Sequence, residues 1–264
     1  MRVKVFQVRA GEDKRENLRR ICSMLESSSA DLNVFPEYLM GVGREGVTAS
    51  YVTGLAEPLD GEFAGRMIDI SREKGFAVVF SMFLRERERV FNAAVLADKG
   101  RVAAVYRKVH LFDAYGYKES RVFSPGTEPV VTRVEGYNLG LAVCFDLRFP
   151  ELFRAMMLRG AEVFVVPSAW YRGPYKVEQW ISLTKARAHE NVSYLLAVNQ
   201  ASENFIGHSV VVSPWGYTLT ELGEGEAVIE LELDRGELEK AREALPVRNL
   251  LRVDLYRRWL ENVK

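Results

Sequence analysis

Short apolar segments alternate with amphipathic segments along most of this 264-residue chain, and this alternation limits the fold more than any other feature of the sequence. FAVVFSMFL (76–84) is typical of a buried strand, whereas Leu18, Ile21 and Leu25 recur at the spacing of one helix face. Further strands and helices of both kinds are interleaved, without repeats or linkers. The pattern predicts one α/β domain over residues 1–264, built as a sandwich with mixed sheets.

The ends of several elements can also be predicted. Glu62–Lys74 is expected to be a helix that ends at Gly75, a residue suited to a left-handed helix cap. GVGREG (Gly41–Gly46) fits the glycine string of dinucleotide-binding turns, but Pro36 ends the preceding strand too early, so we expect a loop. The following VTASYVTG lacks helical periodicity. A last helix is expected from Arg235, followed by an irregular tail.

Composition and charge exclude several classes of site and partner. The formal net charge is zero and no block of like charges occurs, so neither nucleic acid nor an acidic membrane is an expected partner. No apolar run has the length of a membrane span, and the start of the chain becomes charged too early for a signal peptide, which predicts a cytoplasmic protein. Cys22 and Cys144 form no CxxC pair, and His110, His189 and His208 lack metal-ligand spacing. We therefore expect no metal and no cofactor.

Three strand-like segments end by presenting an ionisable residue. LNVFPE presents Glu37, VAAVYRK presents Lys108 and LGLAVC presents Cys144. Ligands gather at the carboxyl ends of strands in α/β sheets, so these side chains have the chance to meet. A carboxylate can take the proton of a thiol, and an ammonium can stabilise the negative charge that develops on a carbonyl oxygen. Spacing alone leaves open whether they converge, and a thiol–imidazole dyad of Cys144 with His110 remains an alternative.

Six motifs, in order, resemble the nitrilase or carbon–nitrogen hydrolase superfamily. They are FPE (35–37), YRKVHLFD (106–113), ESRVFSPG (119–126), CFDLRFPE (144–151), GHSVVVSPWG (207–216) and LPVRNLLRVDLY (245–256). The residues after the cysteine are most similar to the Nit-type branch of amide hydrolases, whereas nitrilases more typically have Trp-Glu there. The resemblance implies a four-layer α-β-β-α sandwich with two mixed sheets.

The resemblance also implies roles for individual residues. Cys144 would be the nucleophile and Glu37 the general base, while Lys108 and the backbone N–H of Phe145 would hold the oxyanion. Glu119 occupies the place of a second glutamate and is expected to help position water. We interpret Asp146, Arg148 and Glu151 as a charge cluster that fixes the turn, with substrate binding by Arg148 as the rival hypothesis. A helix beginning near Phe149 is expected to favour the thiolate.

The predicted reaction is hydrolysis of a small-molecule amide through a cysteine thioester, with release of ammonia and a carboxylic acid. The alternatives are an N-carbamoyl amide hydrolase with the same triad, a nitrilase, and a catalytically silent binding or scaffold protein. Candidate substrate-binding residues share segments expected to surround the cysteine: Tyr38, Tyr115, Tyr117, Arg148, Trp170, Tyr171 and Arg172. A carboxylate-bearing amide would suit Arg172. Because LFRAMML (152–158) is apolar on more than one helix face, and because family members are usually oligomeric, we expect a homodimer or higher homo-oligomer in which residues 245–264 take part.

Overall fold

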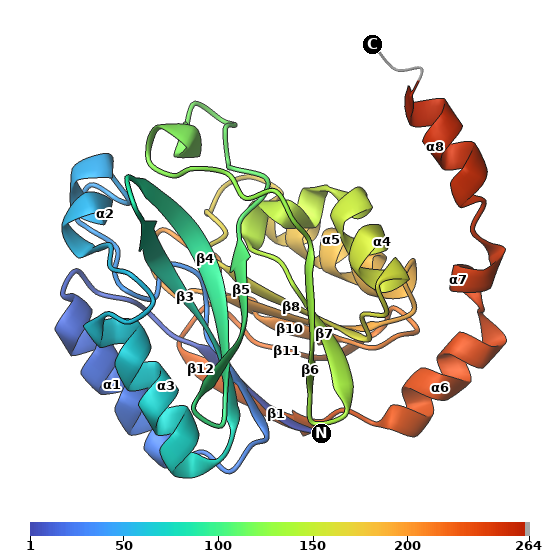
Figure 1. The fold of residues 1–264 in the computed structure, drawn as a ribbon, viewed down its shortest axis with the longest axis horizontal. Helices are drawn as coiled ribbons and strands as arrows, with labels where there is room; N and C mark the ends of the chain where they lie inside the picture. The colour runs from blue at the N-terminus through green and yellow to red at the C-terminus, as the bar shows by residue number, and fades with distance from the viewer. Residues whose placement is uncertain (262–264) are drawn as a thin grey trace.

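The computed structural model describes residues 1–261, which form two six-stranded mixed sheets packed face to face (Figure 1). The order in the first sheet is β12-β1-β2-β3-β4-β5, with β1–β2 and β2–β3 parallel and the other pairs antiparallel. Its strands are β1 (Arg2–Gln7), β2 (Leu32–Val34), β3 (Ala77–Glu86), β4 (Arg89–Asp98), β5 (Arg101–Arg107) and β12 (Ala227–Glu232).

The second sheet repeats this pattern with the order β11-β10-β9-β8-β7-β6. The pairs β7–β8 and β8–β9 are parallel, and the outer pairs are antiparallel. Its strands are β6 (Val130–Val134), β7 (Tyr137–Leu141), β8 (Val163–Ser168), β9 (Tyr194–Asn199), β10 (Val210–Val212) and β11 (Thr218–Glu221). The predicted mixed sheets are confirmed.

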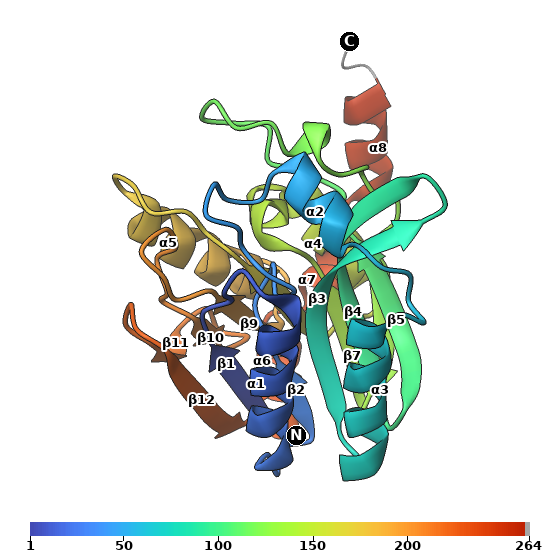
Figure 2. The same cartoon turned by 90° about the vertical axis from the view of Figure 1, so that its left-hand side faces the viewer.

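Helices cover the outer face of each sheet and complete the four layers (Figures 1 and 2). On the first sheet lie α1 (Lys14–Glu26) and α3 (Glu62–Lys74), and on the second lie α4 (Pro150–Leu158) and α5 (Lys176–His189). As predicted, α3 ends at Gly75, whose φ of 73° is left-handed. The four-layer sandwich implied by the sequence motifs is confirmed.

The alternation of side chains along the strands explains the layers. In β1, Val5 belongs to the core that joins the two sheets, whereas its neighbour Phe6 belongs to the core beneath α1 and α3. The same change of side occurs between Val79 and Val78 of β3. Cys22 lies on the buried stripe of α1, as expected for a cysteine retained for packing. These two strands of the first sheet therefore have two apolar faces.

Two parts of the chain differ from the sequence-based prediction. Residues expected to lack helical structure form α2 (Ala49–Leu55), which is capped by the Thr48 side chain. The tail after α6 (Arg235–Ala244) is not irregular, because it forms α7 (Val247–Leu250) and α8 (Val253–Glu261). The last residues of the predicted tail, 262–264, lie outside the described residues. The glycine stretch of residues 41–46 is a loop, as predicted.

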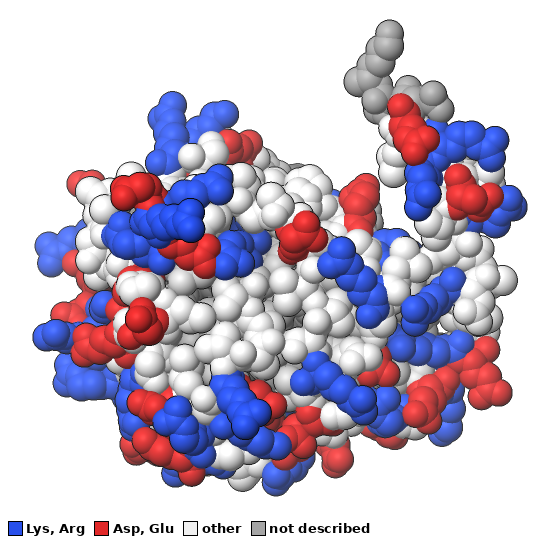
Figure 3. Space-filling view, viewed as in Figure 1, with Lys and Arg blue, Asp and Glu red and all other residues white. Residues whose placement is uncertain are grey.

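The surface carries both signs of charge in mixture. Figure 3 shows Lys and Arg side chains interspersed with Asp and Glu around the visible face, whose centre has few charged side chains, and α8 standing away from the body of the molecule. Among residues 1–261, no helix combines the length with the apolar character needed to cross a membrane.

Candidate active site

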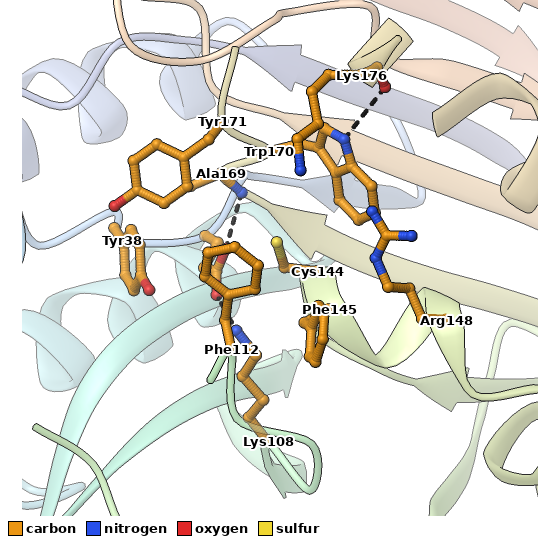
Figure 4. Close-up of a pocket in the computed structure, with 11 residues that line it drawn as sticks. Tyr38, Lys108, Phe112, Cys144, Phe145, Arg148, Ala169, Trp170, Tyr171 and Lys176 are labelled. Carbon is orange, nitrogen blue, oxygen red and sulfur yellow. Dashed lines mark hydrogen bonds and ion pairs between the residues drawn. The ribbon is translucent and has the colours of Figure 1, made fainter. Parts of the chain in front are cut away.

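A cavity opens where the two sheets meet, and the three strand-end residues line it together. Glu37 and Lys108 follow strands of the first sheet, whereas Cys144 follows β7 of the second. Figure 4 shows Lys108 and Cys144 together in the cavity. The convergence that the sequence left open therefore occurs. The other lining residues are Tyr38, Phe112, Phe145, Arg148, Ala169, Trp170, Tyr171 and Lys176.

The Glu37 carboxylate is fully buried and held by three donors. Its Oε1 accepts hydrogen bonds from Lys108 Nζ at 2.9 Å and from Asn92 Nδ2 at 2.7 Å. Its Oε2 accepts the backbone N–H of Ala169 at 2.8 Å, and the side-chain amide of Gln200 donates to the Glu37 carbonyl at 2.8 Å. Contacts from both sheets thus fix the orientation of this carboxylate.

Lys108 is only 1 % exposed and lies between two carboxylates. Its Nζ is 2.9 Å from Oε1 of Glu37 and 2.9 Å from Oε2 of Glu119. Glu119 is fully buried, and it also accepts hydrogen bonds from Asn92 Nδ2 at 2.9 Å, from the Tyr38 hydroxyl at 3.2 Å and from a backbone N–H. Glu119 contacts Lys108 and Tyr38, which line the cavity, but is not itself among the lining residues.

Cys144 begins a 3₁₀ turn, Cys144–Arg148, with a left-handed φ of 47° that is uncommon for a residue other than glycine. Asp146 holds this turn in place. Its Oδ2 accepts the Val143 N–H at 2.9 Å and the Tyr106 hydroxyl at 2.7 Å, and its Oδ1 accepts the His110 N–H at 3.0 Å. The strained backbone at Cys144 is therefore supported by a buried carboxylate with partners on two segments.

Burial and neighbouring charges set the protonation states. Burial raises the pKa of Glu37, although the Lys108 ammonium opposes this effect. Burial alone would lower the pKa of Lys108, but the Glu119 and Glu37 carboxylates outweigh it and raise that pKa well above its usual range. Burial, followed by the Glu37 carboxylate, raises the pKa of the Cys144 thiol well above its usual value, against the effect of Lys108.

Burial and the Glu37 carboxylate therefore favour the neutral form of the Cys144 thiol, while Glu119 and Glu37 favour the ammonium form of Lys108. The expected preference for the thiolate is not seen in the direction of the Cys144 pKa, because the loss of solvent around the sulfur acts against the charged form.

The structure separates the candidate substrate-binding residues into two groups. Tyr38, Arg148, Trp170 and Tyr171 line the cavity. The other candidates, Tyr115, Tyr117 and Arg172, lie in a wider outer depression. The predicted role of Arg172 in holding a carboxylate does not fit, because its Nη1 forms a 3.0 Å ion pair with Glu224 and its Nε donates to the Ser202 carbonyl.

His110 does not form a dyad with Cys144. Its Nδ1 lies 2.8 Å from Oδ1 of Asp146, and its ring stacks on Phe149 with centroids 3.7 Å apart. The imidazole is absent from the cavity lining, so its contacts are those of a structural residue. Glu151 is an exposed residue of the first turn of α4, beyond the cavity.

Several residues of the site were not predicted from the sequence. Asn92 is a buried polar residue within the apolar strand β4, and this break in the apolar pattern is a signal that could have identified it. Lys176 and Phe112 also line the cavity. Ala169 contributes only its backbone N–H, so no side-chain pattern could have indicated its role.

Comparison with known proteins places this geometry in a family. The sequence profile described as Carbon-nitrogen hydrolase matches residues 2–243. The chain is 35% identical to the deaminated glutathione amidase of Escherichia coli O157:H7, over 89% of this chain and 91% of that protein. It is 32% identical to the 2-oxoglutaramate amidase of Bacillus subtilis, over 91% and 93% of the two chains.

A solved structure shows the same arrangement of the chain. A mutant of the amidase from Nesterenkonia sp. AN1 superposes with a TM-score of 0.80 at 30% sequence identity, covering 98% of this chain and 96% of that one. That structure is described as showing covalent addition of the acetamide moiety of fluoroacetamide at the active site cysteine. This chain belongs to the carbon–nitrogen hydrolase family, within the nitrilase superfamily that its motifs resemble.

Proposed function

We propose that this protein is an amidase, which hydrolyses a small linear amide through a cysteine thioester and releases ammonia and a carboxylic acid. The observation that carries the proposal is the buried Glu37–Lys108 ion pair, with an Nζ–Oε1 distance of 2.9 Å, in the cavity that also contains Cys144. A structural thiol has no need of a carboxylate and an ammonium in the same water-poor space.

In the first half-reaction Glu37 takes the proton of Cys144 while sulfur attacks the amide carbon. The negative charge that develops on the carbonyl oxygen is stabilised by Lys108 and by the backbone N–H of Phe145, which lines the cavity next to the nucleophile. Glu37 then gives its proton to the departing nitrogen. Ammonia leaves, and the acyl group remains on Cys144 as a thioester.

In the second half-reaction Glu37 takes a proton from water, and the resulting hydroxide attacks the thioester carbon. The same pair of donors holds the oxyanion, and the thiolate leaves with the proton that Glu37 returns. The proposed role of Glu119 in both steps is to position the Lys108 ammonium, which is supported by its 2.9 Å contact with Lys108 Nζ. Its expected help in positioning water stays a prediction.

The relatives favour amide hydrolysis over the alternatives. Those reported above are named as amidases, and the Nesterenkonia enzyme carries an acetamide-derived group on its cysteine. A nitrilase would add water to a carbon–nitrogen triple bond, and an N-carbamoyl amide hydrolase would release carbon dioxide together with ammonia. Product identity therefore separates these reactions.

A panel of aliphatic amides, ω-amides, carbamoyl amino acids and nitriles tests the proposal by release of ammonia and carbon dioxide. Ammonia is expected from amides without carbon dioxide. Trapping of a covalent acyl group on Cys144, detected by mass spectrometry after rapid acid quench, is expected with the same substrates. Ammonia from nitriles alone, or no turnover of any amide, would overturn the proposal.

We also propose that residues 245–261 contact a second copy of the chain. The tail exposes large apolar side chains, with Leu250 67%, Trp259 59% and Leu260 66% exposed, and α8 stands off the body in Figures 1 and 3. Large apolar side chains that are exposed together on one segment are typical of a surface that contacts another protein chain. Sedimentation of the full chain and of its Trp259→Ser/Leu260→Ser variant tests this. The wild type is expected to sediment as a dimer or larger assembly, and the variant as a smaller species. A monomeric wild-type chain would contradict it.

A further inference from the structure

One buried side chain contacts both acids of the site and takes no part in the proposed reaction. Asn92 lies within β4, is 1 % exposed and does not line the cavity. Its Nδ2 donates to Oε1 of Glu37 at 2.7 Å and to Oε1 of Glu119 at 2.9 Å. Its backbone carbonyl accepts the N–H of Lys108 at 2.9 Å. One residue therefore holds the two acids by its side chain and the lysine between them by its backbone.

The orientation of the Asn92 amide has a cost. Its Oδ1 is buried and has no hydrogen-bond partner among residues 1–261, and a buried acceptor without a partner destabilises a fold. Ala94 and Leu96, on the same face of β4, are apolar and fully buried, so an apolar side chain at position 92 would avoid this cost. The amide is therefore explained by the two hydrogen bonds that it donates, and not by packing.

The donors are divided unequally between the two oxygens of the Glu37 carboxylate. Oε1 accepts both Asn92 Nδ2 and Lys108 Nζ, and two donors occupy the two lone pairs of such an oxygen. Oε2 accepts the Ala169 N–H at 2.8 Å and keeps its second lone pair. Burial, then the charge of Glu37, raises the pKa of Cys144, and a hydrogen bond between these two side chains adds to the effect. The thiol proton therefore has its acceptor on Oε2.

We propose that Asn92 is a positioning residue that keeps Glu37 ionised and directs the proton of Cys144 to Oε2 of that carboxylate. The inference rests on the proposed amidase function and adds a residue that acts through the general base without touching the substrate. Burial raises the pKa of Glu37, and the hydrogen bond from Asn92 acts in the opposite direction. This agrees with the geometry, because hydrogen bonds to the charged form of a carboxyl group favour that form.

The other ionisable groups that face Glu37 leave its titration visible at acid pH. Despite burial, Glu119 and Glu37 raise the pKa of Lys108 well above its usual range, and burial raises that of Cys144. Burial also raises the pKa of the tyrosines that sense Glu37, which are Tyr38, Tyr117 and Tyr171. A loss of activity at acid pH therefore reports on Glu37 and Glu119, two acids that share donors and titrate as a pair.

The acid limb of the pH dependence of kcat/KM for an aliphatic amide tests the assignment. Asn92→Leu removes the side-chain amide and leaves the backbone bond to Lys108 in place. Its acid limb is expected to move upward by about 1–2 pH units, which is the effect of one hydrogen bond to a charged group. Below the limb kcat/KM is expected to fall about 10- to 100-fold, with a deficit that narrows as the pH rises. Asn92→Asp, which places a third carboxylate beside the acids, is expected to move the limb further.

Asn33→Leu is the matched control. Asn33 is a fully buried asparagine of β2 in the same sheet, and its side chain bonds to Ser28 and to the Ala77 carbonyl, away from the cavity. Its acid limb is expected to stay at the wild-type pH, even where its melting temperature falls. Melting temperature and circular dichroism are recorded for each variant.

Two further measurements isolate the effect on Glu37. Glutamine does not titrate, so the limb of Glu119→Gln belongs to Glu37 alone, and addition of Asn92→Leu to this variant is expected to shift it upward again. Alkylation of Cys144 by iodoacetamide, followed by mass spectrometry, gives a second pH profile that needs no turnover. Removal of the thiol proton requires ionised Glu37, so this profile is expected to move by the same amount.

The outcomes separate the two proposals. An unmoved acid limb of alkylation in folded Asn92→Leu or Asn92→Asp, or a loss of kcat/KM that is equal at every pH, overturns the role of Asn92 and leaves the amidase function intact. Absence of ammonia release from every amide, together with a displaced alkylation profile, overturns the amidase function and supports the action of Asn92 on Glu37.

Discussion

Lys108 and Glu119 form an ion pair with an Nζ–Oε2 distance of 2.9 Å, in which both side chains are almost completely shielded from solvent. Glu37 contacts the same ammonium, so one cation neutralises part of the charge of two acids. Charges buried in this way stabilise one another only as a group, and removal of the cation leaves two carboxylates facing each other.

Lys108→Met is therefore expected to damage both catalysis and folding. Loss of an oxyanion donor should lower kcat by about 10²–10³, and the unpaired carboxylates should lower the free energy of unfolding by about 3–5 kcal/mol. Glu119→Gln added to Lys108→Met should restore part of the stability and none of the rate. Urea denaturation and ammonia release measure both quantities. Strictly additive effects on stability would show that the two residues are not coupled.

Cys144→Ala should abolish turnover, with a loss of about 10⁴-fold or more, because no other thiol and no serine or threonine hydroxyl lines the described cavity. The change removes one sulfur atom from a buried site, so the melting temperature and the circular dichroism spectrum are expected to stay close to those of the wild type. Residual amidase activity above the level of the purified Lys108→Met variant would contradict the role given to sulfur.

Glu37→Gln tests the raised pKa of the Glu37 carboxyl. A raised value in the folded state means that the folded chain binds this proton more strongly than the unfolded chain does. The stability contributed by protonated Glu37 is therefore present at low pH and is lost as the pH rises through the folded-state pKa. Glutamine does not titrate, so the melting temperature of the variant minus that of the wild type should increase between about pH 4 and pH 8. A difference that is constant or falls over this range would refute the assignment.

His110→Ala separates a structural role from a catalytic one. The imidazole contacts Asp146 and Phe149, so its removal is expected to destabilise the protein by about 1–2 kcal/mol. Activity of the folded variant should remain within about tenfold of the wild type, since a catalytic base would cost ~10²–10⁴. A loss comparable to that of Cys144→Ala would revive the thiol–imidazole dyad.

The fold could be predicted because it depends on strong local patterns, whereas the roles of the candidate catalytic residues were inferred from the resemblance of their motifs to a known family. Glu37, Lys108 and Cys144 each follow an apolar strand segment, and strand ends meet in space whatever the distance along the chain. The helix α2 was missed because only one of its residues, Val52, is buried, so no apolar stripe marks it. For α8 the sequence does contain an apolar stripe, because residues 253, 256 and 260 are apolar and have helical spacing.

The walls of the cavity were harder to predict. Tyr171 and Arg172 are adjacent in sequence, but only the first lines the cavity. A lysine in the first turn of an amphipathic helix is usually solvated, so nothing in the sequence distinguished Lys176. The cytoplasmic location and the oligomeric state stay predictions.

Glu37 and Lys108, the proposed general base and oxyanion donor, follow strands of one sheet, whereas Cys144, the proposed nucleophile, follows a strand of the other. The position of the Cys144 sulfur relative to the Glu37 carboxylate consequently depends on how the two sheets pack against each other. A displacement of about 1 Å can cost on the order of 10²-fold in rate. Substitutions such as Val79→Ala in the apolar interior between the layers, remote from any reacting atom, should therefore slow the enzyme out of proportion to the stability they remove. Close packing between the two sheets is therefore expected to help set the rate of the reaction.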